Sequence, residues 1–85
     1  MSKSINKIKQ EIASFLNTIN VEPIEMSYVH GKVHDIDNDI IVDDDVMNVT
    51  VNTNLDKLNE DDNKRMFLFD IYMHQDHGIT LNFDW

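Results

Sequence analysis

The sequence predicts a small α+β domain, residues 1–85, in which an N-terminal helix packs on an antiparallel sheet of about four strands. Two observations favour this class. Apolar residues recur with a helical period near the N-terminus, and they alternate with polar residues through much of the remaining chain. The predicted order is helix, two strands, a short second helix and two further strands, with the helices on one face of the sheet.

The composition is that of a chain that folds without disulfide bonds or thiolate-bound metal. Hydrophobic residues make up 41% of the sequence and cysteine is absent, so no disulfide or thiolate site supports the fold. A domain of this length buries about 60–65% of its unfolded surface. The first fifteen residues carry lysines but no continuous apolar run, which argues against a signal peptide or a membrane span. We therefore expect a cytoplasmic protein.

Residues 3–19 predict the N-terminal helix. One apolar stripe at three- and four-residue spacings is formed by Ile5, Ile8, Ile12, Phe15, Leu16 and Ile19. Asn20 suits a left-handed helix end, and Pro23 prevents continuation. A membrane-surface helix is the alternative. Its lysines are few and the rest of the chain is anionic, so packing on the sheet is favoured.

Residues 24–30 and 47–53 alternate with a period of two and predict a hairpin. We expect a two-residue loop at Asn38 and Asp39, because both residue types tolerate positive φ. That loop sets Met26 opposite Val51, Tyr28 opposite Val49, Lys32 opposite Asp45, His34 opposite Asp43 and Ile36 opposite Ile41. Two of these pairs join opposite charges, which stabilises a cross-strand pair.

The second half of the chain predicts a short helix over residues 53–64. Apolar alternation returns in 65–74 and 78–85, which predicts two more strands. One longer helix is the alternative for this region. We reject it because Phe67 and Ile71 fall off the apolar stripe that such a helix would carry.

The charge is concentrated in one part of the chain. Residues 34–62 hold ten acidic residues against one lysine, a net charge of −9 that equals the total for the whole chain. Residues 33–45, VHDIDNDIIVDDD, contain six aspartates and no lysine or arginine. So uneven a distribution of charge along the chain indicates what kind of partner the protein binds rather than how it folds. On an extended strand Asp35 and Asp37 lie about 6.6 Å apart, of the same order as the spacing of nucleic-acid phosphates.

Metal sites fit the sequence poorly. An EF-hand loop is imitated at positions 1, 3, 5 and 9 by Asp35, Asp37, Asp39 and Asp43. However, Ile40 replaces the glycine that the loop needs for its turn, and Val46 replaces the bidentate glutamate. A four-histidine zinc site can be drawn from His30, His34, His74 and His77, but nothing in the sequence brings the two pairs together. We expect no metal and no cofactor.

Catalytic signatures are also missing from the sequence. It contains no glycine-rich phosphate loop and no cysteine nucleophile. Asp70 interrupts an apolar segment, and we place it on the wetter face of a strand beside Tyr72 rather than in an active site. The sequence therefore predicts a binding protein and not an enzyme.

The predicted function is inhibition of a basic nucleic-acid-binding protein or nuclease by a nucleic-acid mimic. The predicted partner-binding residues are Asp35, Ile36, Asp37, Asp39, Ile41, Asp43, Asp44, Asp45, Glu60, Asp61 and Asp62. Such acidic proteins occur as phage counter-defence factors and as immunity partners of nuclease toxins. The abundant residues Asn, Ile and Asp have AT-rich codons, and an AT-rich genome is common among phages. A phage-encoded chain would act in the host cytoplasm. Direct nucleic-acid binding is disfavoured, because the negative field around residues 34–62 repels phosphates, and no membrane is expected. The alternative is a structural module whose hairpin packs on another copy, a homodimer, with the acidic stretch only solubilising it.

Overall fold

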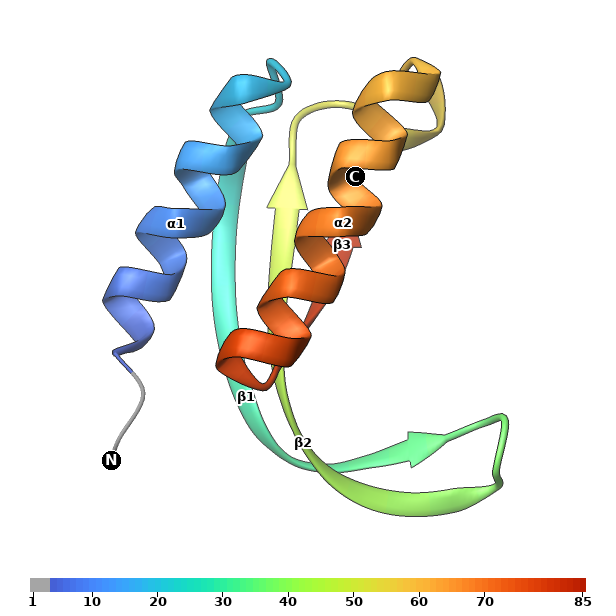
Figure 1. Ribbon diagram of the computed structural model, residues 1–85. Helices are drawn as coiled ribbons and strands as arrows, with labels where there is room; N and C mark the ends of the chain where they lie inside the picture. The colour runs from blue at the N-terminus through green and yellow to red at the C-terminus, as the bar shows by residue number, and fades with distance from the viewer. Residues whose placement is uncertain (1–3) are drawn as a thin grey trace.

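A computed structural model describes residues 4–85, apart from the side chains of Val33, Asp35 and Val42. Its elements are α1 (Ile5–Thr18), β1 (Pro23–Asp35), β2 (Ile40–Val51), the short 3-10 helix η1 (Leu55–Lys57), α2 (Glu60–His77) and β3 (Ile79–Asp84). Both long helices cover the same face of a three-stranded sheet, with α1 against β1 and α2 against β3 (Figure 1). The α+β class and the N-terminal helix packed on a sheet are confirmed.

Helix α1 forms where the apolar stripe predicts it. Ile8, Ile12 and Leu16 are buried against the sheet, one turn apart along the same side of the helix. The helix ends at Thr18, and Asn20 just beyond it adopts the expected left-handed conformation, with a φ of 59°. The turn is closed by the backbone N–H of Val21, which donates to the Leu16 carbonyl at 3.0 Å.

Strands β1 and β2 form the predicted hairpin, but in a register two residues away from the predicted one. Tyr28 lies opposite Met47 rather than Val49, and the partners of Met26, Lys32 and His34 are displaced in the same way, whereas Ile36 lies in the turn and not in the paired strand. The cause is the loop, which has four residues, 36–39, instead of two. It ends with Asp39 at a φ of 51°, which aspartate tolerates. Because a shift of two preserves the pleat, each side chain keeps its predicted face.

Helix α2 corrects the prediction of a strand over residues 65–74. The chain reaches this helix through a 3-10 turn and a new cap at Asn59, whose side chain accepts the Asp62 N–H at 2.8 Å. The core side of the helix carries Met66, Phe69 and the fully buried Met73. Phe67 and Ile71, which misled the prediction, lie on the solvent side of the helix.

Strand β3 lies parallel to β2, whereas the prediction was an antiparallel sheet of four strands. The difference follows from α2, because a long helix carries the chain back to the other end of the sheet before the next strand begins. Gly78 makes the turn out of α2 at a φ of 65°. The buried side chains of α1 meet those of β2, α2 and β3 in one core: Met47, Val49, Val51, Met73, Ile79 and Leu81.

Candidate functional site

The hairpin extends beyond the rest of the fold as a two-stranded arm. Strand β3 pairs with β2 only from Asp45 to Thr50. Beyond that point β1 and β2 continue alone to the 36–39 turn. Figure 1 shows this part of the hairpin curving away from the two helices. We call residues 31–44 the arm.

The end of the arm exposes both aspartates and isoleucines. Asp37 and Asp39 are exposed in the turn and Asp43 is exposed on β2. Ile36 is 83% exposed and Ile41 is 62% exposed. Large apolar side chains in such positions contribute nothing to the core, so the arm displays a mixed acidic and apolar surface.

The carboxylates of the arm do not form the straight row that the sequence suggested. Asp35 is the last residue of β1, and its side chain lies outside the described part of the structure. Asp37 and Asp39 lie in the turn rather than on a strand. Their charge is therefore gathered around the tip of the arm instead of being spaced along one strand.

Asp44 and Asp45 are held by contacts within the protein. The Thr80 hydroxyl donates to Asp44 Oδ2 at 3.1 Å, and Asp44 Oδ1 accepts the N–H of Asp45 at 2.9 Å. Asp45, only 14% exposed at its side chain, accepts the Tyr28 hydroxyl at 3.0 Å and contacts His30 Nδ1. These two predicted partner-binding residues therefore fasten the base of the arm to the sheet. Sequence reasoning missed Thr80 and Tyr28 in this role.

The cationic side chains of the arm come from β1. Lys32 Nζ lies 4.0 Å from Asp43 Oδ1, and His34 Nε2 lies 2.9 Å from Asp39 Oδ1. The predicted partners were Asp45 for Lys32 and Asp43 for His34, and both were wrong because the register differs by two residues. These pairs are well exposed, and ion pairs in that setting contribute little to stability.

Glu60, Asp61 and Asp62 lie at the other end of the molecule from the arm. They form the first turn of α2, and Figure 1 shows that turn at the end of the helix away from the arm. Negative charge at a helix N-terminus interacts favourably with the helix dipole. Asp62 also lies 3.7 Å from Arg65. The structure thus gives these three residues a local role in the helix and does not join them to the arm.

No metal site is assembled by the residues that the structure describes. Among the side chains described, which leave out Asp35, no group of three or more histidine or acidic residues is placed to hold an ion. The segment that imitates an EF-hand is a hairpin, and so lacks the flanking helices of that motif. His77, one of the four histidines considered for a zinc site, instead places its Nε2 3.1 Å from Glu11 Oε2.

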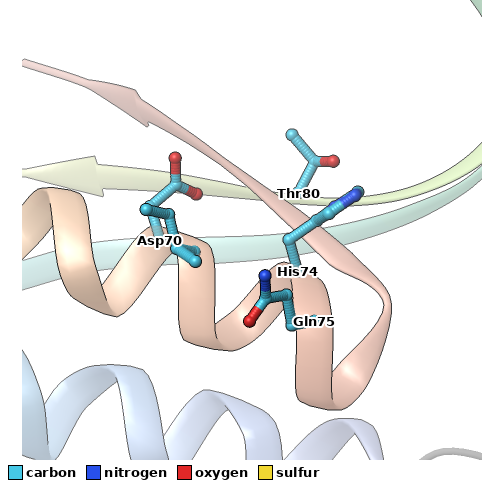
Figure 2. A pocket seen from close by; sticks show the side chains of 5 residues that line it. Asp70, His74, Gln75 and Thr80 are labelled. Carbon is cyan, nitrogen blue, oxygen red and sulfur yellow. The ribbon is translucent and has the colours of Figure 1, made fainter.

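A shallow groove between α2 and β3 is a second candidate site. It is lined by Asp70, Ile71, His74, Gln75 and Thr80, which Figure 2 shows from close by. The prediction had placed Asp70 on the face of a strand; it lies on α2 instead. The groove adjoins the base of the arm, because Thr80 also bonds to Asp44.

A polar cluster joins the two long helices. The Tyr72 hydroxyl donates to Glu11 Oε1 at 2.5 Å, and His77 Nε2 lies 3.1 Å from the other oxygen of that carboxylate. Beside this cluster the rings of Phe15 and Phe69 stack with centroids 4.1 Å apart. The bond to Glu11 is the main cause that raises the pKa of Tyr72 above its usual value near 10; partial burial adds to it.

The folded protein is expected to lose stability in alkali through Tyr72 and Tyr28. Partial burial and the bond to Asp45 raise the pKa of Tyr28 as well. Above about pH 10 the unfolded chain releases phenolic protons that the folded chain retains, so stability present below that pH falls as pH rises further. Urea denaturation at about pH 9 and about pH 11 measures the loss. The variant Y28F/Y72F should show a flatter pH dependence; a loss equal to that of the wild type would contradict this assignment.

Comparison with known proteins adds no identification. No protein-family model matches the chain, and neither a curated protein nor a solved structure matches it. Among the described helices, none has the length and apolar character needed to cross a bilayer.

Proposed function

We propose that the protein is a small acidic inhibitor whose arm occupies the basic site of a nucleic-acid-binding protein or nuclease. The observation that supports this function is the exposure of aspartates and isoleucines together on a projecting element. Ile36 is 83% exposed and shares the turn with exposed Asp37 and Asp39. Exposed apolar side chains surrounded by charge are typical of protein contact surfaces.

The charge of the arm selects the class of partner. The chain carries a net charge of −9, and its field attracts a basic cleft while it repels nucleic acid itself. Ile36 and Ile41 would supply apolar contacts that a phosphate backbone lacks. These contacts would let the inhibitor bind the cleft more tightly than nucleic acid does and displace it. The proposed setting is that of phage counter-defence proteins and nuclease immunity proteins.

The test is a pull-down from bacterial lysate with the wild-type chain and with the variant D37N/D39N/D43N. These three aspartates are exposed, so the variant should fold while its arm loses three charges. We expect the wild type alone to retain a DNA- or RNA-handling protein. Added wild-type chain should then displace nucleic acid from that purified protein, and the displacement should weaken steeply as salt rises.

The control variant E22Q/E25Q/D84N removes the same charge from exposed positions outside the arm. It should bind as the wild type does. Equal retention by all three chains, or binding that does not change with salt, would contradict the proposal. A dimer of the purified protein that Ile36→Asp dissociates would favour the structural module instead.

A further inference from the structure

The edge of β2 is unpaired along the arm. The strand begins at Ile40, but β3 accompanies it only from Asp45 onward. Within residues 4–85 no strand lies beside Ile40–Asp44 on the side away from β1. In an antiparallel pair, alternate residues direct their N–H and C=O groups away from the partner strand. Such an edge is a template for one more strand.

We propose that the partner contributes an extended segment that pairs with this edge, Ile40–Asp44, as an added strand in line with β3. The inference rests on the proposed function, because it specifies how the arm holds the basic partner. The sheet position is already defined, since β3 occupies the same position beside β2 from Asp45 to Thr50. An added strand would therefore extend the sheet along the arm.

The distribution of charge favours the edge of β2 over that of β1. The outer edge of β1 is also unpaired in the described sheet, but the arm's cationic side chains, Lys32 and His34, lie on β1. Strand β2 presents Asp43 and Asp44 instead. Cross-strand neighbours of opposite charge stabilise a pair, and like charges destabilise it. Strand β1 also ends in Asp35, which offsets the charge of Lys32, whereas the arm part of β2 carries no cationic residue. A basic segment is therefore attracted more strongly to β2 than to β1.

The order of side chains along β2 defines a complementary sequence pattern. Because side chains alternate between the faces of a strand, Ile41 and Asp43 share one face and Ile40 and Asp44 share the other. Each face thus offers one exposed isoleucine followed by one aspartate. An antiparallel segment that matches both faces reads basic-basic-any-apolar-apolar, and a parallel one reads the reverse.

The contact with Asp43 is available to such a segment. Its side chain is 69% exposed, and the neighbouring Lys32 amine lies 4.0 Å away with 77% of its own side chain exposed. An exposed pair of this kind is weak, so an incoming lysine or arginine can replace it. Asp44 keeps its bond to Thr80 and adds negative charge where the segment meets the start of β3.

The test uses three synthetic peptides with the full-length protein. One carries Lys-Arg-Thr-Val-Ile between Gly-Ser flanks, one carries the same residues scrambled as Lys-Val-Thr-Ile-Arg, and one has alternate amides of the first sequence N-methylated. The matched peptide should slow hydrogen exchange at the outward amides of Ile40–Asp44. It should bind at least about tenfold more tightly than the other two. Methylation removes strand hydrogen bonds but leaves charge and apolar surface, whereas scrambling leaves the hydrogen bonds but misplaces basic and apolar side chains.

Variants of the protein separate the contribution of charge, at Asp43, from that of apolar contact, at Ile41. Asp43→Asn and Ile41→Thr, both at exposed positions, should each weaken the matched peptide several-fold. Asp43→Asn should leave the scrambled peptide unchanged, because that peptide places an apolar residue opposite Asp43 in either strand direction. Equal binding of the methylated and matched peptides would overturn strand addition, while the charge-based function would stand on its own pull-down. Protection of the same amides in the free protein, rising with protein concentration, would assign the edge to a second copy and would also overturn the proposal.

Discussion

Replacing Leu16 by alanine is expected to lower the free energy of unfolding by about 2–5 kcal/mol. Leu16 is fully buried in the last turns of α1 and faces the sheet. Truncation removes apolar contacts and leaves a cavity that the surrounding sheet cannot close. In a domain this small, a loss of that size lowers the melting temperature by about 10 °C or more. Thermal and urea denaturation measure both quantities.

Asn17→Ala is the matched control for this prediction. Asn17 is the next residue of α1 and is exposed, so its truncation should change stability by no more than about 0.5 kcal/mol. Equal effects of the two substitutions would mean that α1 does not bury this side against the sheet.

The contrast between α1 and α2 shows where sequence periodicity was sufficient. In α1 almost every large apolar residue is on one side, so the pattern has a single interpretation. In α2 Phe67, Leu68 and Ile71 are exposed while Met73 is buried. Apolar residues therefore surround most of that helix, and the pattern also fits alternating strands. Only the packing of Met66, Phe69 and Met73 in the core distinguishes the helix from a strand.

The register of the hairpin and the roles of the arm's aspartates depended on contacts that the sequence does not display. A two-residue and a four-residue loop give the same strand faces, so alternation could not distinguish them. Asp44 looked identical to Asp43 in the sequence. Its bond to Thr80 requires β3 to lie parallel beside β2, and that arrangement follows from the helix that the sequence did not predict. The projecting acidic tip itself was predictable, because no core could cover it.

Leu68→Pro is expected to cost about 3 kcal/mol or more. Leu68 lies inside α2 and is 56% exposed, so its side chain adds little to the core. A proline there removes the N–H that bonds to the carbonyl four residues earlier, and its ring collides with that carbonyl. The helix would break before Met73, and the core contact that joins α2 to the sheet would be lost with it.

Leu68→Ala separates this backbone effect from the loss of the leucine side chain. Alanine has the highest helix propensity, so at this exposed position it should leave stability within about 0.5 kcal/mol of the wild type. Far-ultraviolet circular dichroism and urea denaturation of both variants provide the measurement. If proline were tolerated as well as alanine, residues 65–74 would not be helical, and the parallel placement of β3 would lose its cause. A large loss of stability for proline alone would support the helical connection from β2 through α2 to β3. This connection is what places Thr80 beside Asp44 at the base of the arm.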